Sequence, residues 1–399
     1  MPTPTLTELH AWLERSRRQG SVQYHQGEHS CSVLGHPEAV AVLADPATYS
    51  SDLGDLRPRQ EDLDLFERGN FVRMDPPRHD TLRRLVGQAF TPRVVAGLEP
   101  RIAEVATGLL DEVAGERRFD LIEDLAYPLP VIVIAELLGI PATDRPLFRT
   151  WADRLFERSD AGPDESLARL TSPERMEAAA PAVREMNGYL LEHIRARRSA
   201  PREDLISRLV LAEADGERLV DEEIVGFAGV LLLAGHVTTT ATLGNTVLCL
   251  DAHPGAAAEV RAEPPLLPTA IEEVIRLYTP FPRLVRRTTT DTTAGGTAVP
   301  AGAIVMIWLA AANRDGRVFT DPDRFDPHRS PNPHLGFGHG LHFCLGAPLA
   351  RLEARVAMEL LLRRYSEIAV ESAEYRNPWV MVSPTRLPVT VSESRATVS

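Results

Sequence analysis

One cysteine in the sequence lies among glycines immediately before a helical pattern, in the segment His334–Leu361. Cys344 follows His342 by two residues, and glycines surround it at Gly338, Gly340 and Gly346. A thiolate at a helix N-terminus is stabilised by free backbone N–H groups and by the positive end of the helix dipole, which lower its pKa. The glycines permit a tight loop and the close approach of a flat, bulky group. The segment therefore predicts a thiolate with a chemical role rather than a buried structural cysteine.

Three kinds of chemistry use such a cysteine. A hydrolytic nucleophile needs a base that a third group orients, and His342 is a candidate base with no evident third residue. A zinc site needs ligands at tetrahedral spacing, whereas His339, His342 and Cys344 are crowded into one short loop. Haem iron needs a single thiolate in a close-fitting loop. The sequence matches this third requirement best.

The run Phe337-Gly338-x-Gly340-x-His342-x-Cys344-x-Gly346 resembles the signature of the cytochrome P450 haem-thiolate monooxygenases at every fixed position. The resemblance implies that Cys344 is the axial ligand of the iron of haem b, where its thiolate pushes electron density onto the iron to favour O–O cleavage. It also implies that three other residues of the run contact the haem: Phe337, Gly338 and Gly346.

Basic residues elsewhere in the chain are suited to the two carboxylates of a haem. His79 and Arg83 lie at i,i+4 in PPRHDTLRRLV, so a helix would place both on one face. They resemble the HxxxR pair of the same family, and Arg286 and His342 match two further propionate contacts. Neighbouring residues leave an alternative register open: Arg84 and Arg287.

The stretch Ile224–Leu250 contains no Asp, Glu, Lys or Arg and is long enough to span a bilayer. It carries His236, Asn245 and five threonines, however, and lacks a basic flank. We therefore predict a long helix buried inside a large domain. Gly235 and Thr238–Thr240 are poor helix formers at its centre, which indicates either a local opening at a site or close packing against another helix.

Within this stretch, Ala234–Thr239 resembles the oxygen-binding motif A-G-x-[Asp/Glu]-T-[Thr/Ser] of the P450 family. The resemblance implies that Ala234 and Gly235 leave room for dioxygen. It also implies that Thr238 hydrogen-bonds oxygen at the iron and steadies proton delivery.

The sequence departs from the motif at Val237, which stands where the family has an acid. Valine cannot donate or relay a proton, so three alternatives remain: water ordered by Thr238 and Thr239, a polar group of the substrate, or extensive peroxide release. His236 is turned about 100° away on the helix and is expected to pack against another helix.

Further segments match the family in the expected order. Thr269–Glu272 reads as a capping box that starts a helix, and Glu273 and Arg276 follow at i,i+3 on one face. They resemble the ExxR pair of P450 proteins. The segment Asp321–Phe325 resembles the one whose arginine, here Arg324, completes a buried triad with that pair. The implied role of the triad is structural.

The resemblance implies a mainly helical, triangular fold with small β-sheets, in one domain covering residues 1–399 and best supported over residues 71–365. Helical periodicity extends over most of the chain, as at Leu82, Val86 and Phe90. Three short runs predict strands: Leu284–Thr290, Ala303–Ile307 and Trp379–Val382. Two polar segments predict loops or lids: Ser50–Asn70 and Arg158–Glu174.

The chain of 399 residues is 44% hydrophobic and 25% charged, with a mean hydropathy of −0.14, which is typical of a soluble globular protein. Its net charge of −13 argues against nucleic acid or an acidic membrane as the main partner. It has no signal-peptide pattern, and its three cysteines are widely separated. A cytoplasmic location in a reducing compartment is expected.

The resemblance implies a monooxygenase that inserts oxygen from O2 into a small organic molecule, such as a bacterial secondary metabolite or its precursor. Oxidative coupling, a peroxide-driven haem reaction and a non-catalytic haem-binding recruitment module remain alternatives, and a carrier-protein-bound substrate stays open. No flavin or ferredoxin segment is fused to the chain, so the expected electron donors are a ferredoxin and its reductase. Four arginines are candidates for the docking patch: Arg73, Arg84, Arg93 and Arg314.

By family position, three segments are expected to line the substrate pocket: Phe281–Val285, the loop before Phe71 and the chain near Trp379. Arg283 is expected to be a solvated arginine, with pairing to a substrate carboxylate as the alternative.

Overall fold

The computed structural model describes residues 5–54, 59–89, 91–156, 162, 172–214 and 216–394. Its α-helices are α1 (Leu6–Gln19), α2 (His36–Ala44), α3 (Glu61–Glu67), α4 (Arg78–Ala89), α5 (Pro92–Ala96), α6 (Glu99–Glu112), α7 (Pro128–Leu138), α8 (Arg145–Phe156), α10 (Pro173–Ser199), α11 (Leu205–Leu211), α12 (Asp221–Ala252), α13 (Pro254–Ala262), α14 (Leu267–Leu277), α15 (Leu309–Ala312) and α16 (Ala347–Arg364). Short helical turns are η1 (Gln26–Glu28), η3 (Phe71–Arg73), η4 (Ile122–Ala126), η5 (Ala142–Asp144), η6 (Pro264–Leu266) and η7 (Gly340–His342).

The strands are β1 (Val22–His25), β2 (Ser30–Val33), β3 (Tyr49–Ser50), β4 (Arg118–Asp120), β5 (Glu213–Ala214), β6 (Glu217–Arg218), β7 (Leu284–Thr288), β8 (Thr292–Ala294), β9 (Thr297–Val299), β10 (Ile304–Ile307), β11 (Tyr365–Val370), β12 (Glu374–Tyr375), β13 (Pro384–Arg386) and β14 (Pro388–Glu393). The largest sheet has the order β1-β2-β10-β7-β3, and a second sheet has the order β11-β14-β4. Both sheets join strands that are far apart in the sequence.

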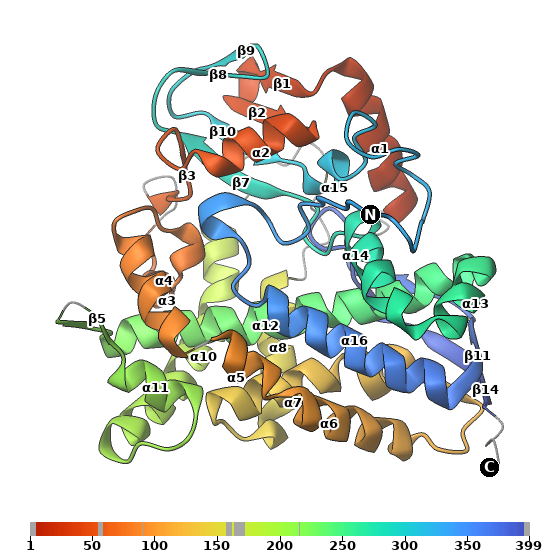
Figure 1. The fold of residues 1–399 in the computed structure, drawn as a ribbon. Helices are drawn as coiled ribbons and strands as arrows, with labels where there is room; N and C mark the ends of the chain where they lie inside the picture. Colours follow the sequence, from red (N-terminus) through yellow and green to blue (C-terminus); the bar gives the residue numbers. More distant parts are fainter. Residues whose placement is uncertain are drawn as a thin grey trace.

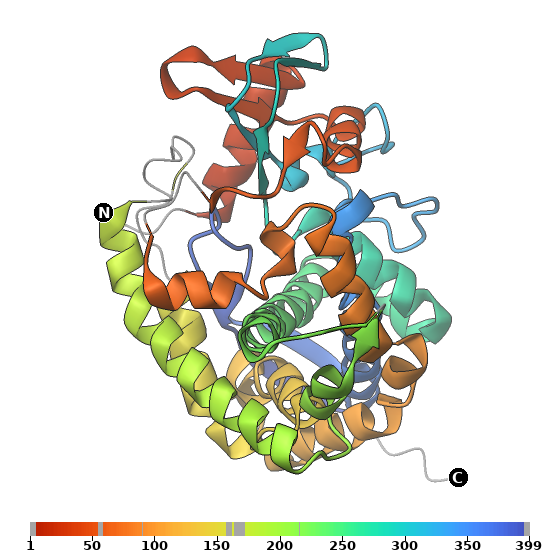
Figure 2. The same ribbon diagram turned by 90° about the vertical axis from the view of Figure 1, so that its left-hand side faces the viewer.

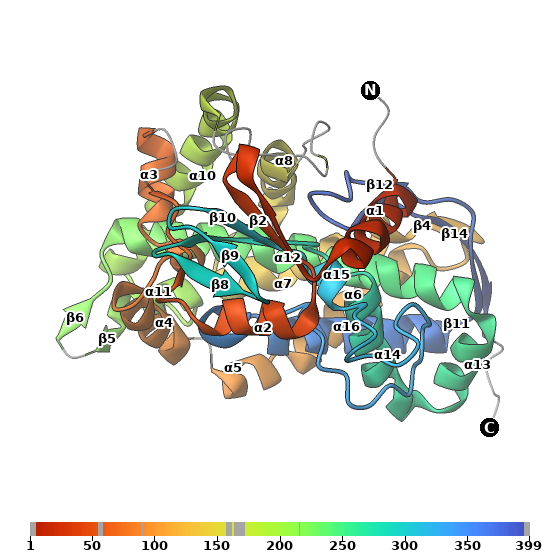
Figure 3. The same ribbon diagram turned by 90° about the horizontal axis from the view of Figure 1, so that it is seen from above.

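The helices and the large sheet form two parts of one body, with the sheet, α1 and α2 above the long helices (Figure 1). Seen from above, the sheet lies over the middle of α12 (Figure 3). A hydrophobic core joins the long helices, and a smaller one lies between the sheet and α2. The observed architecture is therefore the mainly helical fold with small sheets that the sequence predicts.

Helix α12 runs through the centre of the helical part, and Figure 2 looks along it. It is long and apolar enough to cross a membrane, but 72% of its most apolar window is buried inside the protein. At its start, the Glu223 carboxylate accepts a hydrogen bond from the backbone N–H of Val220 at 3.1 Å. The prediction of an interior helix is confirmed.

Of the two alternatives left open for the centre of α12, the local opening is excluded, because the helix is continuous there and Gly235 faces Ile134 of α7. The hydroxyl groups of Thr238, Thr239 and Thr240 donate to carbonyl groups four residues earlier, at 2.7, 3.1 and 2.8 Å. Threonine is tolerated in a buried helix when its hydroxyl has such a partner. The three threonines therefore satisfy their own polar groups without breaking the helix.

Two other local predictions need correction. Trp379–Val382 forms a turn between β12 and β13 instead of a strand. Its apolar run is explained by burial of Trp379 against the rings of Trp12 and Trp308, with centroids 5.3 and 5.9 Å away. The segment Ser50–Asn70 contains α3, which packs against α10 and α12.

Two sequence predictions fall partly or wholly on residues that the structure does not describe. Most of the predicted loop Arg158–Glu174 lies outside the described residues, as does Phe90.

The two other predicted strands are present as β7 and β10, and the helix predicted from the capping box begins two residues before Thr269.

A buried ion pair joins the helices to the segment before the cysteine loop. Glu273 and Arg276 of α14 have fully buried side chains and pair at 2.7 Å. Arg276 also donates to the carbonyl groups of Asn313 and Pro322, at 2.7 and 2.6 Å. The second arginine on Glu273 is Arg329, whose Nε lies 2.9 Å from its carboxylate.

The prediction that Arg324 completes this triad is therefore wrong. The Arg324 side chain is exposed, and only its backbone carbonyl accepts from Arg276, at 3.3 Å. The chain between Asp321 and Arg329 turns back, so that Arg329 faces α14 instead of Arg324. Residue type and order alone could not show this turn.

We predict that Arg329→Ala lowers the free energy of unfolding by about 3 kcal/mol, because it leaves part of a buried carboxylate unpaired. The exposed Arg324→Ala is the matched control and should change it by less than about 0.5 kcal/mol. Denaturant unfolding followed by circular dichroism measures both. Equal losses in the two variants would contradict the assignment of Arg329 to the triad.

Candidate active site

The cysteine loop is held by backbone hydrogen bonds and by two glycines in the left-handed region. The Cys344 N–H donates to the Phe337 carbonyl at 2.9 Å, which closes the loop just before α16. Gly338 and Gly340 have φ values of +72° and +67°. A Cβ on Gly340 would also lie only 2.6 Å from the backbone oxygen of Leu43, so this position requires glycine.

The Cys344 sulfur lies at the start of α16, as predicted. It accepts hydrogen bonds from the backbone N–H groups of Gly346 and Ala347, and these lower its pKa, as do the charges of Arg83 and Arg351. Burial is the larger effect and raises the pKa of the thiol above its ordinary value. The expectation of a lowered pKa therefore does not hold for the protein alone, although a metal cation at the sulfur would favour the thiolate.

Cys344 is exposed, whereas the other two cysteines are buried. Because burial nevertheless dominates its pKa, protein surrounds the sulfur on most sides. The Cys344 side of the loop is therefore open to solvent, and this opening is called the recess at Cys344. A Cβ on Gly346 would lie 3.9 Å from the sulfur, which is an ordinary van der Waals contact.

Four basic residues from three parts of the chain converge beside this loop. His79 and Arg83 lie one turn apart on α4, and Arg286 lies on β7, opposite Val305 of β10. The rings of His79 and His342 lie 4.5 Å apart. The charges of Arg286 and Arg83 both lower the pKa of His342, as does His79. The four side chains therefore form one cluster.

The cluster contains buried polar atoms that have no partner among the described residues: His79 Nε2, Arg83 Nη1 and His342 Nδ1. Burial lowers the pKa of Arg286 to about 10, and burial together with Arg286 lowers that of His342 to about 3. Buried cations and N–H groups without acceptors are costly unless an anion completes them. The donor set therefore fits the carboxylates of a flat, anionic group seated in the recess at Cys344.

The register alternatives differ in position. Arg83 Nη2 donates to the Phe343 carbonyl at 2.7 Å, beside the cysteine. Arg84 has an exposed side chain, and Arg286 is buried whereas Arg287 is partly exposed. Arg83 and Arg286 are therefore the more enclosed residue of each pair, and their contact with the propionates stays a prediction.

One face of α12 is partly open over about two turns in an otherwise buried region. Val230, Ala234 and Thr238 are each one turn apart and partly exposed, and Gly235 beside them is also partly exposed. The Thr238 hydroxyl donates to the Ala234 carbonyl on this face at 2.7 Å. A Cβ at Gly235 would meet the Ile134 side chain of α7 at 3.5 Å, an ordinary contact, so its missing side chain faces α7.

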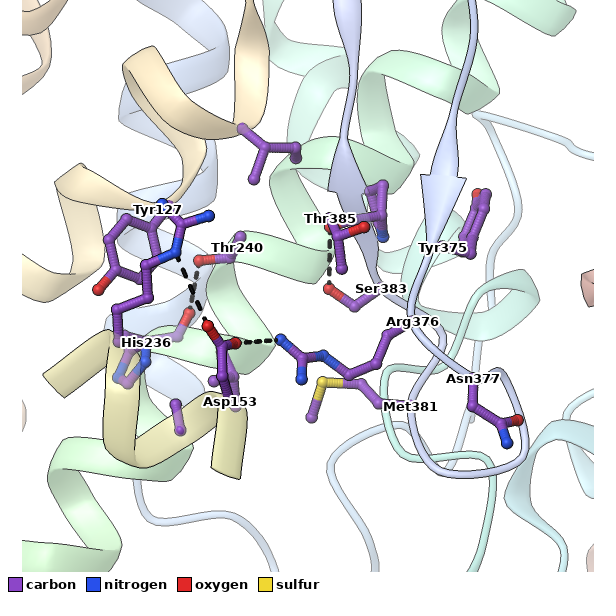
Figure 4. Close-up of a pocket in the computed structure, with 15 residues that line it drawn as sticks. Tyr127, Asp153, His236, Thr240, Tyr375, Arg376, Asn377, Met381, Ser383 and Thr385 are labelled. Carbon is purple, nitrogen blue, oxygen red and sulfur yellow. Dashed lines mark hydrogen bonds and ion pairs between the residues drawn. The ribbon is translucent and has the colours of Figure 1, made fainter. Parts of the chain in front are cut away.

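A separate polar cavity of about 340 Å³ lies against another face of α12 (Figure 4). Its wall on this helix is formed by His236, Val237 and Thr240, and α8 and the chain after β12 close its other sides. Successive helix residues turn by about 100°, so Thr238 lies about 100° beyond Val237 and points away from the cavity. The cavity and the open face are therefore on different sides of the helix.

The charges in this cavity are paired with one another. Asp153 of α8 accepts from Arg376 at 2.9 Å (Figure 4). Arg149 donates to Glu123 at 2.6 Å. Val237 is 7% exposed and contributes an apolar wall here, where an acidic side chain would have projected among these groups.

His236 packs against Tyr127 at the start of α7, as expected, with ring centroids 5.8 Å apart. Its Nδ1 donates to the Leu232 carbonyl at 2.6 Å. Burial lowers the pKa of His236 to about 4, so the ring is neutral near pH 7.

The expected substrate-lining and docking residues have mixed outcomes. Arg283 is not a solvated side chain: its guanidinium lies 5.1 Å from the centre of the Trp308 ring, and burial lowers its pKa to about 10. Arg314 is also largely buried and pairs with Asp323 at 2.7 Å, which removes it from any docking surface. The other three candidate docking residues are exposed: Arg73, Arg84 and Arg93.

Sequence reasoning missed Arg351 of α16, which contacts the cysteine loop at Phe337. Its guanidinium lies 4.3 Å from the centre of the Phe337 ring and pairs with Glu272 at 2.7 Å. The available signal was its place seven residues after Cys344, on the helix that follows the cysteine loop.

Comparisons with known proteins agree with this geometry. A family model described as "Cytochrome P450" matches residues 10–385. The chain is 45% identical to the cyclomarin C epoxidase CymV of Salinispora arenicola, over 91% of this chain and 90% of the relative. It is 44% identical to the erythromycin C-12 hydroxylase of Saccharopolyspora erythraea, over 86% and 84% of the two chains.

Solved structures give the same result. The structure of HmtT, involved in himastatin biosynthesis, has a TM-score of 0.85 at 46% identity and covers 96% of this chain and 97% of its own. A mutant of P450 EryK in complex with erythromycin B has a TM-score of 0.88 at 40% identity and covers 98% and 97%. The chain belongs to the cytochrome P450 family, whose members bind haem b.

We predict that Arg83→Ala and Arg286→Ala each lower haem affinity more than tenfold, since a buried carboxylate without its cation costs several kcal/mol. Arg84→Ala, one residue away and exposed, is the control and should change it much less. Haem transfer from each purified protein to an excess of apo-globin measures the loss. Equal transfer rates in all three variants would count against the register.

Proposed function

We propose that this protein is a haem-thiolate monooxygenase that inserts one oxygen atom of O2 into a small bacterial secondary metabolite or its precursor. The observation that carries the proposal is the exposed sulfur of Cys344 at a helix N-terminus, which lies beside a cluster of basic residues whose buried nitrogen atoms include three without a partner among the described residues. Haem b in the recess at Cys344 supplies the iron at which dioxygen is bound and reduced. The remaining tasks belong to side chains of the chain itself.

Each site residue has a distinct proposed role. Cys344 ligates the iron, and the loop residues Phe337, Gly338 and Gly346 shape the space around the sulfur. The cluster of His79, Arg83, Arg286 and His342 binds the two propionates and so orients the haem plane. Ala234, Gly235 and Thr238 form the oxygen side of the pocket, where Thr238 holds a hydroxyl donor and Ala234 keeps the face open.

The substrate class is supported by the relatives, which are named as an epoxidase and a hydroxylase of cyclomarin C and erythromycin. PikC of Streptomyces venezuelae, a cytochrome P450 monooxygenase, is 39% identical over 95% of this chain. We propose that Phe281–Val285 and the loop before Phe71 line the substrate pocket. Trp379 is buried in the aromatic cluster, so it supports its loop and leaves substrate contact to its neighbours.

We propose a ferredoxin with its reductase as the electron source, docking near the N-terminus of α16. Arg84 of α4 and Arg93 of α5 are exposed, and α4, α5 and α16 lie on the same side of the molecule (Figure 1). A local basic patch suits an acidic partner on a chain whose net charge is −13.

The organisation of the chain fits the same proposal. Strands from the N-terminal and C-terminal halves share both larger sheets, which supports one domain over residues 1–399. The three cysteines are free, which supports a cytoplasmic location.

The test of the proposed function is spectroscopic. The purified protein should bind one haem, and its reduced carbon-monoxide complex should show the red-shifted Soret band of thiolate ligation. Cys344→Ser should abolish that band and keep the helical circular-dichroism spectrum, while the buried Cys249→Ser should keep both. A normal thiolate band in Cys344→Ser would refute the ligand assignment. Haem binding without oxidation of any candidate substrate would favour the recruitment module.

Electron transfer from the ferredoxin should slow as ionic strength rises, because salt screens charges beyond about 8–10 Å. Arg84→Glu and Arg93→Glu should slow it at low salt, whereas Arg314→Gln, at a largely buried site, should not. Stopped-flow reduction under carbon monoxide measures the rate. A rate that is indifferent to salt and to both charge reversals would contradict docking at this surface.

A further inference from the structure

The polar cavity between α8 and α12 has no part in the proposed oxygen chemistry. Its volume of about 340 Å³ lies within the range of small-molecule sites, which is about 300–1,000 Å³. The side chains of Arg149 and Asp153 on α8 are 41% and 43% exposed, so they mark its mouth. Val237 and Met381 are 7% and 0% exposed and close its inner end. The cavity, called here the α8–α12 cavity, therefore reaches from the surface to the central helix.

The hydroxyl groups in its wall use their hydrogens within the protein. Five of them each donate to a protein oxygen at 2.8–3.4 Å: those of Tyr127, Thr240, Tyr375, Ser383 and Thr385. A hydroxyl whose hydrogen is engaged in this way still has lone pairs with which it accepts. These five groups therefore present acceptors to the cavity.

His236 adds a further acceptor on the α12 side of the cavity (Figure 4). Its Nδ1 lies 2.6 Å from the Leu232 carbonyl, which can only accept, so Nδ1 carries the hydrogen of the neutral ring. Nε2 then has a lone pair, and it is buried without a partner among the described residues. A buried acceptor without a donor is costly, so this atom indicates a hydrogen-bond donor that the protein itself does not provide.

The charged groups of the wall balance one another. Asp153 accepts from Arg376 at 2.9 Å, and its other carboxylate oxygen lies 3.9 Å from Arg149 Nε. Arg149 also donates to Glu123 at 2.6 Å, so two guanidinium groups face two carboxylates. Val237 adds no charge at the position where the family has an acid. A charged ligand would leave one charge of this set unpaired, which disfavours it in an enclosed site.

Apolar side chains separate the polar groups of the wall. They are Ile122, Ala152, Val237, Met381 and Pro384. A complementary ligand must therefore have C–H surface between its hydrogen-bonding groups. A ring that carries several hydroxyl groups meets this requirement, because each hydroxyl can donate to the wall oxygens and accept from the guanidinium groups.

We propose that the α8–α12 cavity is a second ligand site, separate from the recess at Cys344, and that it binds an uncharged polyhydroxylated ring such as a sugar. The ring hydroxyls donate to the wall oxygens and to His236 Nε2, and they accept from Arg376. A free sugar and a sugar attached to a larger metabolite share this chemistry. The inference goes beyond the proposed monooxygenase function and does not require turnover.

The first test is equilibrium binding of D-glucose to the holoprotein, measured by saturation-transfer NMR. Permethylated D-glucose has no hydroxyl donors and should bind about tenfold more weakly, which corresponds to the loss of one or two hydrogen bonds. D-Gluconate and D-glucosamine are charged and should each bind several-fold more weakly. Absence of D-glucose binding, or equal binding of the permethylated sugar, would overturn the proposal and indicate a cavity that holds only water.

The second test locates the bound sugar with variants. Val237→Phe fills the inner end, and Thr385→Val removes one wall oxygen, so each should weaken D-glucose binding several-fold. Thr150→Val is the matched control, because this exposed hydroxyl of α8 also donates to a carbonyl, that of Pro146 at 2.8 Å, but lies outside the cavity. It should bind D-glucose like the wild type. If Val237→Phe does not fold, Thr385→Val decides, and unchanged binding in Thr385→Val would overturn the site.

An optical titration separates this site from the haem pocket. D-Glucose in the α8–α12 cavity should leave the Soret band of the ferric holoprotein unchanged, because the cavity and the open face lie on different sides of α12. A Soret shift with D-glucose would place the sugar beside the iron and overturn a separate site. Phenyl β-D-glucoside distinguishes the two sources of the sugar. Displacement of bound D-glucose together with a Soret shift assigns a sugar attached to a metabolite, and any other result assigns a free sugar.

Failure of the proposed function is distinguishable from failure of this inference. A protein without the thiolate band, or one that oxidises no substrate, would refute the monooxygenase and leave the D-glucose measurements unaffected. A protein that turns over but does not bind D-glucose would refute the second site alone.

Discussion

The sulfur of Cys344 can occupy only one place, because the loop before it and the helix after it are both fixed. The backbone bond from Cys344 to Phe337 closes the loop, and the first N–H groups of α16 point at the sulfur. Helix α16 packs against α12 and α14. Movement of any of these helices would displace the sulfur relative to the open face of α12 that carries Thr238. The packing of these helices therefore fixes the distance between the Cys344 sulfur and the face of α12 that carries Thr238.

The interior contains one group of charged residues that are paired with one another and a second group that are not. The first group stabilises the fold, and the second marks the candidate active site. Glu273, Arg276 and Arg329 satisfy one another and the carbonyl groups around them, so they hold the chain before the cysteine loop in place. The basic residues beside Cys344 are less enclosed and are incomplete: Arg83 and His342 each keep a buried nitrogen without a partner among the described residues. A folded protein tolerates such atoms where a ligand completes them. The haem is thus part of the folded structure as well as of the chemistry.

The residues that depend on local pattern could be predicted from sequence. The cysteine at the start of α16, the i,i+4 pair on α4 and the interior course of α12 follow from spacing, periodicity and the resemblance that the motifs carry. Several of the failures involve how a loop or a side chain is placed in three dimensions. Arg329 replaces Arg324 in the triad because of how one loop folds back, Arg283 is covered by Trp308, and Arg314 is buried beside Asp323. These three contacts depend on the tertiary structure, so they could not be read from residue type and order alone. The sequence left open whether the centre of α12 is interrupted, and the structure decides this because each threonine hydroxyl bonds within the helix.

The central claim is that one cysteine sulfur, that of Cys344, is bound to iron. The most direct measurement is iron X-ray absorption of the holoprotein in which both buried cysteines, Cys31 and Cys249, are replaced by serine. The account predicts one sulfur neighbour in the first coordination shell of the iron, at a distance unchanged from that in the wild type. A first shell that contains only nitrogen and oxygen would contradict it, because Cys344 is then the sole cysteine left in the chain.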